Sequence, residues 1–245
     1  MKKYFPIIAV VIIISVWISE SGAEGWLKRG MEIFLDEPET RENSQLAESD
    51  IVQGLREALR VGSENVVSHL GRENGYYLDP RAHISLPEGL QQVQHIMNRA
   101  GMGRTLDDLE LRMNRAAEQA TPKARDMFVN AISEMTLDDA RGIYNGPDDA
   151  ATRYFQDKMS GPLSLEFTPI VRESLAQAGA VRVFDDLMSD YNKLPFVPDA
   201  SADLTRHVVD RSITAIFDYL ALEEKGIRNN PVKQTTSILR KVFGR

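Results

Sequence analysis

The chain of 245 residues contains no cysteine. Disulfides, thiolate metal sites, cysteine nucleophiles and a lipid-modified N-terminal cysteine are therefore all excluded. Histidine is scarce, and its four positions are widely spaced, without the HExxH pattern of zinc hydrolases. The GxSxG nucleophile elbow and the GxxxxGK[ST] phosphate loop do not occur either. The sequence thus offers no recognised catalytic motif, predicts no metal or cofactor, and must rely on an apolar core for stability.

Positive charge is also in short supply, because 29 Lys and Arg residues face 36 Asp and Glu residues, for a formal net charge of −7. Such a field repels nucleic acid phosphates and anionic membrane surfaces, so neither is expected as a partner. One basic stretch, residues 225–245, contains no acid and is interpreted as a solvated helix end.

The N-terminus has the pattern of a cleaved secretory signal peptide. Lys2 and Lys3 precede an apolar run from Phe5 to Ile18, and the small residues of Ser21-Gly22-Ala23 suit a cleavage site. The apolar run is shorter than the roughly 20 residues that a spanning helix needs. Residues 1–23 are therefore predicted to be removed, which gives a periplasmic protein with no stable membrane span. The alternative is an uncleaved N-terminal anchor.

Apolar periodicity predicts an all-α fold for the rest of the chain. Residues 24–47 are interpreted as an N-terminal segment with a polar linker, and residues 48–245 as a single bundle-like domain of about nine helices. Residues 76–86 alternate between polar and apolar and predict at most a short strand or extended arm. The predicted helices include residues 48–70, 105–119, 148–159, 163–177, 180–191, 202–225 and 231–243.

The segment TLDDARGIYNGPDDAATRYF, residues 136–155, holds the most unusual polar chemistry. Most of it fits one helix ending and another beginning: Thr136 and Asp139 form a capping box, Asn145-Gly146 suits a left-handed stop, and an acidic first turn follows Pro147. The same side chains could instead bind a polar ligand or calcium, although the spacing is wrong for an EF-hand. The candidates are Asn145, Asp148, Asp149, Thr152, Asp138 and Asp139.

A second candidate pair is Asn114 and Glu118, which are four residues apart on one predicted helix and share a face. An asparagine within a helix is mildly unfavourable unless its side chain finds a partner. We interpret Asn114 as hydrogen-bonded to a neighbouring helix. The alternative is a catalytic carboxylate at Glu118.

Several segments together resemble one bacterial family, the domain of unknown function 4197. They are IVQGLREALRVGSENVV (51–67), ISLPEGLQ (84–91), LDDLELRMNRAAEQA (106–120), FVNAISEMTLDDARGI (128–143), DDAATRYF (148–155) and IRNNPVKQTTSILRKVFG (227–244). The resemblance implies a mostly helical envelope protein of Gram-negative bacteria, secreted or lipid-anchored, and it supplies no activity or catalytic residue. This chain departs from the family pattern at Pro147, where glycine is usual, and in lacking a lipid-accepting cysteine. These departures disfavour a glycine-rich ligand loop and favour a soluble protein.

These observations lead to three functional hypotheses. The first is a non-catalytic periplasmic protein that binds a partner protein or a small, lipid-like ligand in a groove between amphipathic helices. The second is a hydrolase of an envelope component that uses carboxylates near residue 118 or within residues 138–149, which requires them to converge in one pocket. The third and weakest is a calcium-stabilised structural protein.

Overall fold

The computed structural model describes residues 48–99, 104–191, 203–230, 233–234 and 236–244. The predicted signal peptide and linker lie outside these residues. The described part of the chain contains helices and no strand, which confirms the all-α prediction. The helices are α2 (Glu48–Leu70), α3 (Glu88–Arg99), α4 (Arg104–Ala120), the 3-10 helix η1 (Thr121–Lys123), α5 (Ala124–Ser133), α6 (Leu137–Tyr144), α7 (Ala150–Gln177), α8 (Ala180–Tyr191), α9 (Leu204–Asn229) and α10 (Ser237–Phe243).

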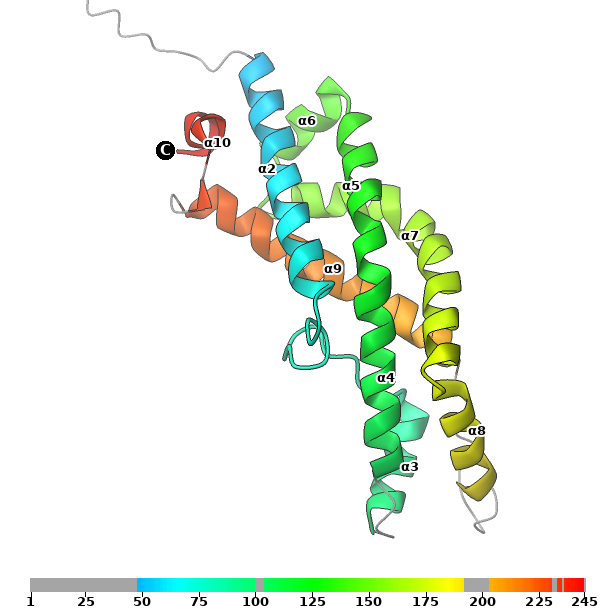
Figure 1. Ribbon diagram of the computed structural model, residues 1–245. Coiled ribbons are helices and arrows are strands. Elements are labelled where there is room, and N and C mark those ends of the chain that lie inside the picture. Colours follow the sequence, from blue (N-terminus) through cyan, green and yellow to red (C-terminus); the bar gives the residue numbers. More distant parts are fainter. Residues whose placement is uncertain (1–47, 100–103, 192–202, 231–232, 235, 245) are drawn as a thin grey trace, which may run out of the picture. The chain divides into compact units, whose positions relative to one another are not determined.

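Helix α9 is the central element of the compact unit Leu46–Arg245, because it packs against α2, α4, α7 and α10 (Figure 1). Helices α4 and α5 follow one another through η1 nearly along one line, and α8 lies beside α4 (Figure 1). The core between these helices contains Phe128 of α5 and Phe155 of α7, whose rings meet edge to face with centroids 5.1 Å apart. Amphipathic helix packing, as the sequence indicated, therefore builds this unit.

Helix α7 corrects the prediction of two helices over residues 148–159 and 163–177. It runs without interruption from Ala150 to Gln177, with Pro162 and Pro169 inside it. A proline within a helix removes one backbone hydrogen bond and strains the turn before it. The helix continues because every fourth residue of one face is buried in the core, and this burial outweighs the local cost. The buried residues are Phe155, Met159, Leu163, Phe167 and Val171.

The predictions based on local helix signals are correct at α2 and α6. Helix α2 has the predicted bounds, Glu48–Leu70. At the start of α6, the Thr136 hydroxyl accepts a hydrogen bond from the Asp139 amide at 3.1 Å, and the Asp139 carboxylate accepts one from the Thr136 amide at 3.0 Å. The predicted capping box is therefore confirmed.

Candidate functional site

The turn between α6 and α7 lies at the end of α9 and brings Asn145 and Asp148 there. Asp148 and Asp149 were predicted in the first turn of a helix, but α7 begins only at Ala150, and the Asp149 side chain caps no amide. The amides of Ala151 and Thr152 instead donate to the Glu224 carboxylate of α9, each at 2.9 Å. Glu224 therefore does the capping that sequence reasoning assigned to the local aspartates.

Arg228, one turn after Glu224, completes this junction. Its guanidinium donates to the Ile143 carbonyl at 2.7 Å, to the Tyr144 carbonyl at 3.3 Å and to Glu224 at 3.0 Å. The Glu224 and Arg228 side chains are only 5% and 12% exposed. Helix α9 thus places a carboxylate at the positive end of α7 and a guanidinium at the negative end of α6, as the helix dipoles favour.

The sequence contains a sign of this pair, although none of the predicted site residues includes Glu224 or Arg228. Glu224 lies four residues after Leu220 and three before Ile227, both buried, so it occupies the core-facing stripe of α9. A charged residue in such a stripe needs a partner. Its partners on α7, Ala151 and Thr152, lie 73 and 72 positions earlier in the chain, so no local pattern identifies them.

Asn145 and Gly146 end α6, but not in the predicted left-handed conformation. Asn145 has a φ of −87°, and the described residues with positive φ are Asn74 and Gly179. Gly146 serves a different purpose, because a Cβ atom there would lie 2.6 Å from the Cβ of Ala150. The turn requires glycine for this close approach of the two helices rather than for backbone freedom.

A polar cleft of about 590 Å³ opens at this junction. We call it the polar cleft; its walls come from the α6–α7 turn, the end of α9 and α10, and they contain Tyr144, Asn145, Gly146, Asp148, Arg228, Asn229, Gln234, Val242 and Phe243. Two of the predicted candidates, Asn145 and Asp148, line it. Asn229 donates to Asp148 at 3.3 Å, and Asn145 donates to the Arg141 carbonyl at 3.0 Å.

The other candidates of the segment do not join this cleft. Thr152 is buried, and its hydroxyl donates to Glu224 at 2.9 Å. Asp149 pairs with Arg153 at 2.8 Å on the surface. Asp138 is exposed and accepts from the Arg141 side chain at 3.0 Å.

Asp139 lines a separate cleft of about 330 Å³ together with Tyr154. Hydrogen bonds from the Thr136 hydroxyl and amide lower the pKa of the Asp139 carboxyl. Burial, with a smaller effect of Asp139, raises the pKa of the Tyr154 phenol. The described carboxylates of residues 138–149 therefore lie in different surroundings rather than in one pocket.

Asn114 and Glu118 belong to a ladder of side chains on α4 that holds the segment between α2 and α3. Asn114 is fully buried; its side chain accepts from the Ile84 amide and donates to the Ile84 carbonyl, each at 2.9 Å. Glu118 accepts from the amides of Tyr76 and Tyr77 at 3.1 and 3.3 Å. The expected hydrogen bond of Asn114 exists, but its partner is this segment rather than a neighbouring helix.

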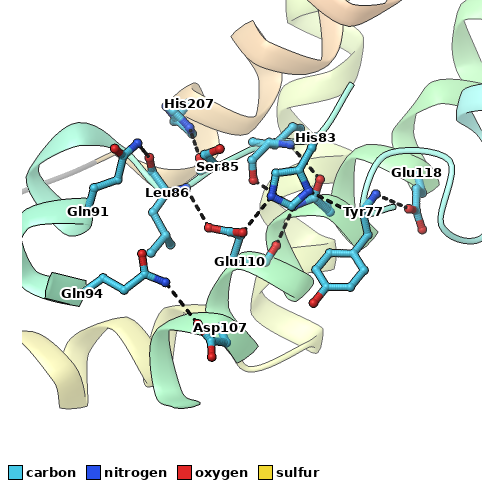
Figure 2. A network of polar contacts seen from close by, with 12 residues as sticks. Tyr77, His83, Ser85, Leu86, Gln91, Gln94, Asp107, Glu110, Glu118 and His207 are labelled. Atoms are coloured by element: carbon cyan, nitrogen blue, oxygen red, sulfur yellow. Dashed lines mark hydrogen bonds and ion pairs between the residues drawn. The ribbon is translucent and has the colours of Figure 1, made fainter. Parts of the chain in front are cut away.

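Glu110 completes the ladder, four residues before Asn114. Its carboxylate lies 2.7 Å from Nε2 of His83 and accepts from the Leu86 amide at 3.2 Å (Figure 2). The predicted alternation is real, because Ala82, Ile84 and Leu86 are buried. The segment is an extended arm whose backbone bonds to side chains of α4 instead of to a second strand.

Asp79, at the start of this arm, joins it to α2 and α9. Its carboxylate accepts from the Tyr219 hydroxyl at 2.6 Å and lies 2.9 Å from Nε2 of His69. Burial alone would raise the pKa of Asp79, but hydrogen bonds from Tyr219, His69 and the amides of Ala82 and Arg81 outweigh it and hold the pKa well below its usual range. Burial and the bond to Asp79 raise the pKa of Tyr219 to about 12.

A third concave surface, the apolar groove, lies between α2 on one side and α5 and α6 on the other. It has a volume of about 660 Å³ and is lined by Ser49, Val52, Gln53, Arg56, Glu57, Arg60, Val129, Ile132, Ser133, Leu137 and Ile238. Val129 and Leu137 are 52% and 55% exposed, so apolar surface in this groove faces water. No signal in the sequence marked it, because each helix contributes only a few of its residues.

Within the described residues, no group of three or more His, Asp or Glu side chains could hold a metal ion. Helices long and apolar enough to cross a membrane are likewise missing from the described ranges.

Neither the curated proteins nor the solved structures yield a match. A family profile described as "Protein of unknown function (DUF4197)" matches residues 45–244, which spans the helical unit with its polar cleft and apolar groove. The chain therefore belongs to the DUF4197 family.

Proposed function

We propose that this protein is a non-catalytic periplasmic binding protein that holds an amphipathic helix of a partner protein in the apolar groove. The observation that carries the proposal is the exposure of Val129 and Leu137 in one concave surface, beside the buried Val52 and Ile132. Apolar surface gathered in this way is costly to leave in water and is typical of interaction sites.

The two walls of the groove differ in a way that suits an amphipathic helix. Helix α2 contributes a polar edge that runs from Ser49 to Arg60, about 16 Å at the helical rise, or three turns. Helices α5 and α6 contribute the exposed apolar side chains, Val129 and Leu137. A helix lying along the groove would place its apolar face toward Val129 and Leu137 and its flank against α2.

The charged residues of α2 indicate which charge the facing side of the partner helix should have. Arg60 is paired with Glu57 at 2.9 Å. Arg56 donates to the Met135 carbonyl at 2.7 Å, but its buried Nε has no acceptor among the described residues, and no carboxylate pairs with it there. A partner helix with an acidic residue facing Arg56 would supply the missing partner.

A helix fits this surface better than an acyl chain does. An acyl chain gains most when it is enclosed on all sides, whereas Val129 and Leu137 are half-exposed in a groove open to water. An amphipathic helix buries one face and keeps the other hydrated, so an open groove suffices.

The hydrolase alternative lacks the convergent carboxylates that it requires in the described part of the chain. Glu118 is engaged with two backbone amides and with Arg115 at 2.6 Å. Asp139 and Asp148 lie in different clefts. The geometry of the described residues therefore supports a hydrolase less than it supports binding of a partner protein.

Affinity capture from solubilised envelopes of the host tests the proposal, with wild-type, Val129→Asp and Leu165→Asp proteins as baits. Leu165 is 78% exposed on α7 and lines neither the groove nor the polar cleft, so it is a matched control. We expect one protein to be retained by wild type and by Leu165→Asp and lost with Val129→Asp. A synthetic peptide of its amphipathic segment should then compete.

Two outcomes would contradict the proposal. Equal retention by all three baits would show that the groove is not the docking surface. Phospholipid in the wild-type protein, detected by native mass spectrometry and absent from Val129→Asp, would assign the groove to a lipid instead.

The periplasmic location rests on the N-terminal residues, with Lys2 and Lys3, the apolar run and the small residues before Glu24. N-terminal sequencing of protein from the periplasmic fraction should begin at Glu24. A chain that keeps its N-terminus and sediments with membranes would instead show a retained anchor.

A further inference from the structure

We propose that the polar cleft is a binding site for a neutral saccharide, distinct from the apolar groove. Saccharides present neighbouring hydroxyl groups, each both a donor and an acceptor, on a ring with an apolar C–H face. A site for them needs planar polar side chains and at least one aromatic face. The polar cleft combines three carboxamide side chains, one carboxylate and two aromatic rings within about 590 Å³, a volume in the range of small-ligand sites.

The polar groups of the cleft keep hydrogen-bonding capacity that the protein does not use. Asp148 accepts from Asn229 through Oδ2, and Asn229 also donates to the Lys225 carbonyl. No partner for Oδ1 of Asp148 or Oδ1 of Asn229 is present in the described residues. Asn145 uses one of its two N–H groups, toward the Arg141 carbonyl. Free acceptors and a free donor therefore stand together, as a hydroxyl-bearing ligand requires.

The charge balance of the cleft favours a neutral ligand. The positive charge of Arg228 is matched by Glu224, 3.0 Å away, and its hydrogens point to backbone carbonyls of α6 as well. Asp148 is the one carboxylate among the lining residues, and it would repel an anion. A hard cation such as calcium takes six to eight oxygen ligands, more than the polar cleft offers, and the Arg228 guanidinium in the cleft would repel it.

Two aromatic rings supply the apolar face. Tyr144 at the end of α6 and Phe243 of α10 lie with ring centroids 6.1 Å apart and planes inclined by 52°. Both residues are half-buried and line the cleft. The negative face of an aromatic ring attracts the weakly positive C–H edge of a sugar ring.

The walls are held in place before any ligand arrives. Gln234 is buried and donates to the carbonyls of Ile227 and Phe243 at 3.2 and 3.0 Å, which ties α9 to α10. The Glu224–Arg228 pair fixes the α6–α7 turn on the other side. A preorganised cleft loses little conformational entropy on binding.

The test uses the full mature chain and a panel of neutral probes: glucose, N-acetylglucosamine, maltose and chitotriose. Saturation-transfer NMR finds binders, amide shift mapping on wild-type protein locates them, and calorimetry gives the Kd. We expect at least one probe to bind with a Kd of about 1 mM or tighter, with shifts on the residues of the polar cleft.

A pair of matched variants isolates the site. Asn229→Ala removes an exposed amide that donates to Asp148 at 3.3 Å, and Asn65→Ala removes an exposed amide that donates to Glu223 at the same 3.3 Å, in a different cleft. Asn229→Ala should weaken binding about tenfold or more, whereas Asn65→Ala should leave it unchanged. Asp148→Asn, which keeps the shape of the side chain, serves as a second variant.

The proposal is overturned if no probe binds at the stated level, if the shifts map outside the polar cleft, or if Asn229→Ala binds as tightly as wild type and Asn65→Ala do. Tighter binding of glucuronate or inorganic phosphate than of any neutral probe would also overturn it, since the cleft would then select anions. The shift mapping uses unmodified protein and so holds even if a variant fails to fold.

Discussion

Removing the charge of Glu224 should destabilise the protein far more than removing the charge of Asp149, although both carboxylates lie near the start of α7. Glu224 accepts from two amides and one hydroxyl of α7 and pairs with Arg228, with both side chains nearly buried. Asp149 pairs with Arg153 where the two side chains are 41% and 66% exposed. The contrast tests whether the junction depends on α9 or on the local aspartates.

The magnitude follows from burial. Loss of one partner of a buried ion pair costs about 3–5 kcal/mol, because the remaining charge is stranded. Glu224→Gln should therefore lower the free energy of unfolding by about 3–5 kcal/mol and the Tm by roughly 6–20 °C. An exposed pair contributes about 0.5 kcal/mol, so Asp149→Asn should be nearly silent.

Urea denaturation followed by circular dichroism measures both variants. The double variant Glu224→Gln/Arg228→Gln should lose less than the sum of the two single losses, since neither charge is then left alone. Equal losses below about 1 kcal/mol for Glu224→Gln and Asp149→Asn would refute the account of the junction.

Three further predictions follow from single positions. The pKa of Asp79 is depressed in the folded state, so its contribution to stability is complete above the unfolded pKa of about 4 and is lost as the pH falls below it. In a plot of the urea midpoint against pH, Asp79→Asn should therefore reduce the fall in the midpoint below about pH 4. The same fall as in wild type would contradict this. Asn114→Ala should lower the free energy of unfolding by at least about 2 kcal/mol and speed tryptic cleavage after the exposed Arg81. Wild-type values for both would show that Asn114 does not hold the arm. Gly146→Ala should destabilise the protein, because the added Cβ would lie 2.6 Å from the Cβ of Ala150. Gly142→Ala, whose Cβ would meet no atom within 4 Å, should stabilise the protein by about 1 kcal/mol. Thermal melts measure both, and Tm shifts in the same direction would contradict this.

The sequence predicted those features whose causes are local. The bounds of α2 and the Thr136–Asp139 capping box depend on residues within a few positions of one another. The break predicted between residues 159 and 163 was wrong because core burial along α7 outweighs the cost of Pro162 and Pro169, and this burial depends on distant helices.

At the candidate site, too, the sequence predicted the local features and missed those that depend on contacts between distant segments. The sequence picked out Asn145 and Asp148, which do line the polar cleft, but it gave no sign of Asn229 or Gln234 on the opposite wall. Those residues reach the cleft because α9 packs against α7, a contact that local patterns do not specify. The apolar groove was missed for the same reason, since its two walls come from helices distant in the chain.

Photo-crosslinking in living host cells tests partner binding most directly. Benzoylphenylalanine in place of Val129 projects into the apolar groove, and the same residue in place of Leu165 projects into solvent elsewhere. We expect one protein adduct of defined mass from position 129, reduced by Arg56→Gln, and none from position 165. No adduct from position 129, or the same adduct from both positions, would contradict it.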